Sequence, residues 1–294
     1  MSAATSVLPA AAAPARRGPG LPLVALLILP IAAVNALGFL APVLNLLRMS
    51  FYEAQATGAM AEVYTLATWA TVFGDGFYLA LILNSVGVSL AITLLTLACS
   101  YPIALYLHRA SGTWRTLLLV LVISPLLTSA VVRTYGWIAI LADQGLVNNA
   151  LAAIGLSRTR LMFNLTGVII GLTEILMPYM ILALLAGFGR LDPRLEEAAA
   201  TLGAPPCAVF RRVVLPLTLP GIALGSLLCF VLAVSSFITP KLLGGGRVFL
   251  LATEIYDQAI VTLNWPLAAT LSILVLVVFG AALVLYTRAL RAML

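Results

Sequence analysis

Apolar residues gather in six long runs, which short polar segments separate along the chain. Each run reaches the roughly 20 residues that a helix needs to cross a hydrocarbon core. Lipid offers the backbone no hydrogen-bond partner, so such runs form helices or closed barrels, and barrel strands alternate apolar with polar positions. These runs do not alternate, so they predict an all-α membrane protein with six transmembrane helices. The predicted helices are Pro22–Leu47, Leu79–Leu107, Thr116–Leu141, Thr166–Phe188, Leu217–Phe237 and Leu267–Tyr286.

The composition excludes a soluble protein. Of 294 residues, 63% are hydrophobic and only 9% are charged, and the mean hydropathy is +1.13. Soluble domains carry about 25% charged residues, so the charges of this chain cannot cover a soluble surface. The net charge of +6 comes from scattered basic residues that do not cluster with aromatic ones, which argues against nucleic-acid binding.

The basic residues predict the orientation in the membrane, because cytoplasmic loops are enriched in Lys and Arg. With both termini in the cytoplasm, ten basic residues lie inside and five outside. Residues 1–20 are rich in Ala and Pro, and we expect a disordered cytoplasmic N-terminus there, followed by a transmembrane domain over residues 21–294. The ten inside residues are Arg16, Arg17, Arg109, Arg115, Arg190, Arg194, Arg211, Arg212, Arg288 and Arg291.

A polar cytoplasmic loop, residues 190–216, separates the fourth and fifth runs. Its first part predicts a short helix over Arg194–Leu202, because Asp192 suits the N-cap and Pro193 suits the first helical position. Gly203 suits a left-handed C-cap. The helix dipole favours the acidic Glu196 and Glu197 in the first two turns.

The predicted helix has one apolar face, because Leu195, Ala198, Ala199 and Leu202 follow three- and four-residue spacing. A short helix with such a stripe can enter a groove on another protein. The alternative is that it packs on its own helix bundle.

The spacing within this loop carries a resemblance to a known signature. Glu197 begins Glu-Ala-Ala, Gly203 follows six positions later, and Val213 precedes Leu215-Pro216. This resembles the EAA motif of ABC-importer permease subunits, E-A-A-x3-G-x9-I-x-L-P, with Val213 in place of Ile. The resemblance implies that the loop couples the chain to ATPase subunits. The implied coupling residues are Glu196, Glu197, Ala198, Ala199, Leu202, Gly203, Leu215 and Pro216.

The resemblance extends over residues 75–290 to the spermidine/putrescine type of permease. It is carried by Arg133–Trp137, Asp143–Asn148 and Phe237–Arg247 as well as by the loop. It implies the type I importer fold in a bacterial inner membrane, two ATPase subunits, an extracytoplasmic solute-binding protein and a second permease that is a different chain. The implied substrate is a polyamine or related organic cation, with an opine, amino-acid derivative or phosphonate left open.

The chain lacks the phosphate loop G-x4-G-K-[ST], since Gly244–Arg247 has no following Lys-Ser/Thr. We therefore expect no cofactor in this chain and place ATP and Mg²⁺ on the partner ATPase. The isolated Cys99, Cys207 and Cys229 indicate neither a metal site nor a disulfide framework, and His108 has no ligand neighbours. No catalytic constellation is legible, so the sequence predicts a transport subunit and not an enzyme.

Ionisable residues inside a membrane are costly and usually face a pathway or an interior. Glu174 and Arg133 meet this description. Glu174 could contact a cationic substrate, pair with a polar group of the second permease, or stay protonated; Arg133 better suits an interface or a gate. The predicted pathway set is Glu174, Tyr179, Ser235, Ser236, Thr239 and Arg133, with Asn84, Tyr135 and Trp137 as weaker candidates, interhelical hydrogen bonds being the alternative for the uncharged members.

The alternative function is a secondary transporter or channel that couples to an ion through Glu174, and an intramembrane enzyme is disfavoured.

The small-x3-small patterns Gly167–Gly171 and Gly221–Gly225 let helices approach closely. They serve either packing within the subunit or a subunit interface.

Overall fold

The computed structural model describes residues 21–54 and 60–293, so the predicted disorder of residues 1–20 falls outside it. The chain divides into two units, one ending at Leu46 and one beginning at Leu47. The first unit holds α1 (Leu21–Asn35), a π-helical turn η1 (Ala36–Leu40) and most of α2 (Ala41–Met49). Residues 28–49 are long and apolar enough to cross a membrane, which agrees with the first predicted span.

The second unit contains four long helices, which match the second, fourth, fifth and sixth predicted spans. Each is long and apolar enough to cross a membrane. The four helices are α4 (Gly76–Arg109), α8 (Leu165–Gly187), α11 (Leu215–Ser235) and α14 (Trp265–Met293).

The core lies where α4, α8 and α11 pack together. Ile92, Leu172, Met180 and Cys229 belong to one buried cluster that joins these three helices. Buried hydroxyls on α4 bond to the carbonyl one turn back, as Thr96 Oγ1 does to Ile92 O at 2.7 Å. Such bonds satisfy polar groups that lipid would leave unpaired, so the polar positions of α4 do not break the helix.

The third predicted span, Thr116–Leu141, is not one straight helix. It is divided between α5 (Gly112–Ile123) with the 3-10 turn η2 (Ser124–Leu127), and α6 (Ala130–Leu141) with α7 (Leu146–Ala153). The two parts are bent by 100°, so the described residues hold five membrane-crossing helices, or six if the bent pair counts as one.

Local chemistry explains the break. Pro125 has no backbone N–H to extend the helix. Thr128 is extended, and the Ser129 side chain then caps α6 by accepting a hydrogen bond from Val131 N at 3.3 Å. The apolar run thus contains both a helix stop and a helix start.

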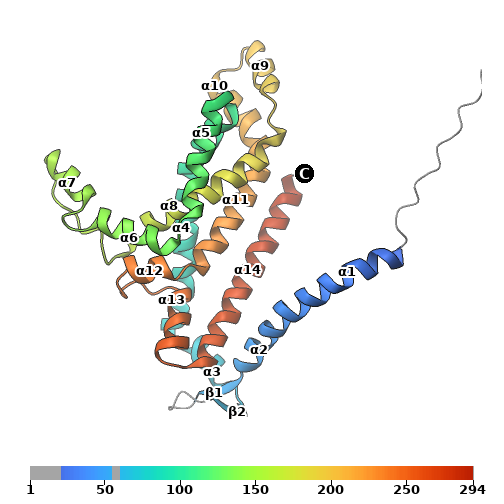
Figure 1. Cartoon of the computed structure of the whole chain (residues 1–294), viewed down its shortest axis with the longest axis vertical. Helices are drawn as coiled ribbons and strands as arrows, with labels where there is room; N and C mark the ends of the chain where they lie inside the picture. Colours follow the sequence, from blue (N-terminus) through green and yellow to red (C-terminus); the bar gives the residue numbers. More distant parts are fainter. Residues whose placement is uncertain (1–20, 55–59, 294) are drawn as a thin grey trace, which may run out of the picture. The chain divides into compact units, whose positions relative to one another are not determined.

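Short elements occupy the two ends of the second unit (Figure 1). One end carries α9 and α10, and the opposite end carries α3, α13 and an antiparallel hairpin that pairs Ala54 with Met60. The end that carries α9 comprises the elements of the loop between α8 and α11, which are η3 (Phe188–Arg190), α9 (Pro193–Thr201), α10 (Pro206–Val209) and η4 (Phe210–Val214). The remaining short elements are β1 (Tyr52–Ala54), β2 (Met60–Tyr64), α3 (Ala67–Gly74), α12 (Ile238–Leu243), α13 (Leu251–Tyr256) and η5 (Asp257–Val261).

Glycines let α8 and α11 touch along their backbones. A Cβ added at Gly187 would lie 2.2 Å from Gly221 Cα, and one added at Gly225 would lie 2.6 Å from Met180 Sδ. Gly171 likewise faces Leu243 of α12. These contacts favour packing within the subunit over a subunit interface as the role of Gly171, Gly221 and Gly225.

Replacing Gly187 with Ala is expected to force α8 and α11 apart and to destabilise the protein by about 1–3 kcal/mol, the usual cost of overpacking. The measurement is the thermal unfolding midpoint in detergent. Gly280→Ala in α14 is the matched control, because a Cβ there meets nothing within 4 Å. Equal midpoints for the two variants would contradict the close approach.

Candidate functional site

The helix predicted in the cytoplasmic loop is present as α9, Pro193–Thr201. Asp192 caps it, since its Oδ1 accepts a hydrogen bond from Arg194 N at 2.9 Å, and Pro193 occupies the first turn. Leu202 is the C-cap and Gly203 has a φ of +81°, the left-handed conformation that glycine adopts without strain. The local rules therefore predicted this helix and both of its ends.

The apolar stripe of α9 points mostly away from the bundle. Leu202 is 90% exposed and Leu195 is 45% exposed. Ala198 is also exposed, whereas Ala199 is half-buried. This arrangement disfavours the alternative in which α9 packs on its own bundle, and it leaves an apolar surface on a polar loop.

The Arg109 end of α4 anchors the loop at two points. Arg109 Nη2 lies 2.6 Å from Glu196 Oε2, and His108 Nε2 lies 3.2 Å from Leu191 O. The His108 ring also meets the Phe188 ring edge-on at 5.6 Å. Exposed ion pairs contribute about 0–1 kcal/mol, so the Arg109–Glu196 pair orients α9 more than it stabilises the fold.

The second half of the loop returns to the bundle at Leu215 and Pro216, the first residues of α11. Leu215 is half-buried and Pro216 is exposed. A pocket of about 410 Å³ separates this return from α9, and its lining includes Glu196, Glu197 and Val214. The EAA glutamate and the residue before Leu215 therefore face one hollow, while Leu202 and Gly203 lie outside it.

The structure joins the two ionisable residues that the sequence placed inside the membrane. Arg133 on α6 and Glu174 on α8 form an ion pair with 2.9 Å between Nη2 and Oε1. Trp137 donates its indole Nε1–H to the other carboxylate oxygen at 2.9 Å. The sequence pattern singled out each of the three residues separately and did not predict their contact. The four-residue spacing of Arg133 and Trp137, which puts both on one helix face, was the available signal.

The other predicted pathway residues do not converge on Glu174. Thr239 is buried and its hydroxyl shares a hydrogen bond of 2.9 Å with Thr134, so the interhelical alternative describes it. Ser235 Oγ bonds to Val231 O of its own helix. Tyr179 is 36% exposed. A substrate contact for these residues and for Ser236 stays a prediction.

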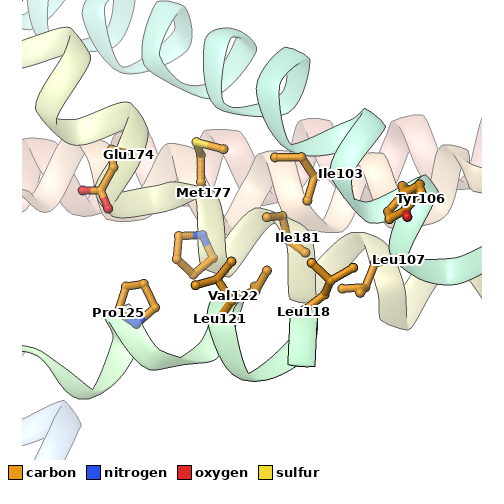
Figure 2. Close-up of a pocket in the computed structure, with 11 residues that line it drawn as sticks. Ile103, Tyr106, Leu107, Leu118, Leu121, Val122, Pro125, Glu174, Met177 and Ile181 are labelled. Atoms are coloured by element: carbon orange, nitrogen blue, oxygen red, sulfur yellow. The ribbon is translucent and has the colours of Figure 1, made fainter. Parts of the chain in front are cut away.

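Glu174 contributes to a pocket of about 270 Å³ between α4, α5 and α8 (Figure 2). Figure 2 shows Glu174 at one end and Tyr106 towards the other, with apolar side chains such as Met177 and Leu121 between them. Among the described residues, no group of three or more His, Cys, Asp or Glu could hold a metal ion. The pocket therefore offers one carboxylate, Glu174, whose charge Arg133 neutralises, among mostly apolar side chains.

Similarity to known proteins covers most of the chain. Residues 100–292 match the family described as "Binding-protein-dependent transport system inner membrane component". The spermidine/putrescine transport system permease protein PotB of Salmonella typhimurium is 36% identical over 252 residues, which cover 85% of this chain and 88% of the relative. PotB of Escherichia coli K12 is 35% identical, with 85% and 91% covered.

A solved structure shares the fold. The bacterial alginate ABC transporter in complex with alginate pentasaccharide-bound periplasmic protein contains a chain with a TM-score of 0.71 at 20% identity, covering 92% of this chain and 94% of that one. The architecture is that of a type I ABC importer permease, as the sequence predicted. The chain therefore belongs to the inner membrane components of binding-protein-dependent transport systems, as a multi-pass permease subunit of an ABC importer.

Proposed function

We propose that this permease subunit passes a polyamine, such as spermidine or putrescine, or a related organic cation across the inner membrane. One observation carries the substrate class: the relatives named for spermidine/putrescine transport are 35–36% identical to this chain over 85% of its length. The match spans nearly the whole of each relative, so it covers the membrane domain and not only a shared loop.

ATP hydrolysis by two partner ATPase subunits, which hold ATP and Mg²⁺, drives the proposed transport. The exposed stripe of α9 supports this role, because Leu195 and Leu202 offer an apolar surface that a partner groove can cover. A second permease, a different chain, completes the pathway, and an extracytoplasmic solute-binding protein delivers the substrate. The family description and the periplasmic protein bound to the alginate transporter support that delivery.

Both termini lie in the cytoplasm under this proposal. The ten-to-five distribution of basic residues supports this orientation. The direction of α14 agrees, because its C-terminal end points towards the end of the second unit that carries α9 (Figure 1).

The coupling step follows from the anchors of the loop. Closure of the ATPase pair would displace α9, and a capped helix moves as a rigid piece. The contacts from Arg109 to Glu196 and from His108 to Leu191 would pass this displacement to α4. Because α4 packs on α8 and α11 in the core, movement of the loop reaches the centre of the bundle.

Uptake of labelled spermidine into proteoliposomes tests the proposed function. With both permeases, the ATPase subunits and the binding protein present, we expect uptake that requires ATP, and that excess putrescine but not alginate oligosaccharide reduces. Uptake that an ion gradient drives in the absence of the ATPase subunits would instead support the ion-coupled transporter. ATP-dependent uptake of another solute, without spermidine uptake, would overturn only the substrate class.

A change at the α9 cap tests the rigid coupling step. Asp192→Ala removes the N-cap acceptor and is expected to cost about 1 kcal/mol of helix stability, with faster amide exchange in α9 and less substrate moved per ATP hydrolysed. Asp192→Asn is the matched control, because Asn caps about as well as Asp. Equal transport-to-ATPase ratios in the two variants, despite faster exchange in the Ala variant, would contradict a rigid α9.

A further inference from the structure

We infer that Arg133, Trp137 and Glu174 form a clamp that holds the broken third span on α8, and that Glu174 is a positioning residue and not the ligand of a transported cation. The inference rests on the proposed function only for its transport readout. The clamp consists of these three side chains, two from α6 and one from α8.

The break before α6 creates the need for such a clamp. A helix that ends leaves its last carbonyls without intrahelical partners, and inside a bilayer unpaired backbone groups are costly. Arg133 reaches across to Glu174 O at 3.3 Å, a carbonyl whose partner position in α8 is Pro178 and has no N–H. It also reaches back to Pro125 O in η2 at 3.5 Å, where Thr128 N donates as well. A cation at this position also suits the negative end of the preceding helical segment. One guanidinium thus links η2, α6 and α8.

A guanidinium in this place requires a counter-charge. The Arg133 side chain is only 11% exposed, and a guanidinium keeps its charge in proteins. Arg133 itself supplies a donor to Glu174 Oε1, while Trp137, one turn later, supplies a donor to Oε2. Both carboxylate oxygens are therefore occupied by groups of α6, which fixes the rotation of this helix against α8.

A second face of α6 is tied as well, because successive helical residues point in different directions. The hydroxyl of Thr134, the residue after Arg133, shares its hydrogen bond with Thr239 of α12. The clamp and the Thr134–Thr239 bond leave α6 held between two neighbouring elements. Its position, and with it the direction in which α7 leaves the bundle, depends on both ties.

The clamp argues against Glu174, the carboxylate in the pocket of Figure 2, as the binding group for a cationic substrate. A substrate ammonium group that bound Glu174 would have to share the carboxylate with Arg133 and Trp137, which would weaken the counter-charge of that guanidinium. The Glu174 side chain is 36% exposed, so the pair is only partly buried, but in the apolar domain removal of one partner still leaves a costly lone charge, whereas removing both is often tolerated. Selection of a cationic substrate therefore lies with groups other than Glu174.

Paired neutralisation in the assembled complex tests the clamp. Arg133→Gln and Glu174→Gln, each alone, are expected to lower the yield of assembled complex about fivefold or more, because each leaves a lone charge in the membrane. The double variant is expected to recover most of the yield and to show a spermidine KM within about twofold of the wild type. If Glu174 binds the cation, Glu174→Gln and the double variant will share a KM raised about tenfold or more while Arg133→Gln will not, and that pattern overturns the inference.

A milder variant and a second ion pair complete the test. Trp137→Phe keeps the ring but loses the indole N–H, and it is expected to lower the unfolding midpoint without changing KM; a raised KM with an unchanged midpoint contradicts the clamp. Lys241 and Asp257 form a pair between α12 and η5, outside the long helices. Neutralising Lys241 alone is expected to change the yield less than about twofold, and a loss as large as that of Arg133→Gln would remove the special role of the clamp.

Yield and unfolding midpoint depend on no particular substrate. A wild-type complex that does not transport spermidine would overturn the proposed substrate class. The rescue of yield in the Arg133→Gln/Glu174→Gln double variant would still decide whether the clamp exists. A double variant with no more yield than either single variant would overturn the clamp while leaving the transport proposal intact.

Discussion

Lipid cannot pair with a backbone amide or carbonyl, and this constraint governs where the chain can depart from helix. The long helices pair most of their own backbone groups, although Pro102, Pro178 and Pro220 lack the N–H to do so. The buried hydroxyls of α4 bond to carbonyls of the same helix. Where the third span breaks, Ser129 supplies a new cap and Arg133 reaches the carbonyl of Pro125. At this break, nearby polar side chains thus bond to the backbone groups where the helix ends and restarts.

Two Arg–Glu pairs show how the surroundings set the role of the same chemistry. Arg109 and Glu196 meet at the surface, where water screens the charges and the pair serves mainly to orient α9. Arg133 and Glu174 meet between helices of the apolar domain, where an unpaired charge is costly, so each residue makes the other acceptable. The first pair links the loop to α4, whereas the second holds a helix in place.

The sequence predicted the elements that local rules determine. Run length and apolar content located the spans, and Asp192, Pro193 and Gly203 located the ends of α9. The bend of the third span was missed, because Pro125 and Ser129 lie inside an apolar run whose composition alone cannot reveal a change of direction.

Contacts distant in sequence were beyond the reach of a single chain. Arg133 and Glu174 were each singled out, but 41 positions separate them and nothing local indicates that they pair. Gly221 was recognised as a close-packing residue, while its partner Gly187 was not, because Gly187 belongs to neither Gly167–Gly171 nor Gly221–Gly225. The coupling role of the loop and the substrate contacts likewise depend on partner chains.

The Gly187–Gly221 contact also closes the base of the loop that carries α9. The two backbones meet just before the loop leaves α8 and just after it enters α11, so the segment between them is a ring tied at its neck. Tying the ends of a segment removes most of the conformations that a free connection of the same length would sample. The conformational freedom of α9 is therefore that of a closed loop. A displacement of α9 acts on the joined ends of α8 and α11 together.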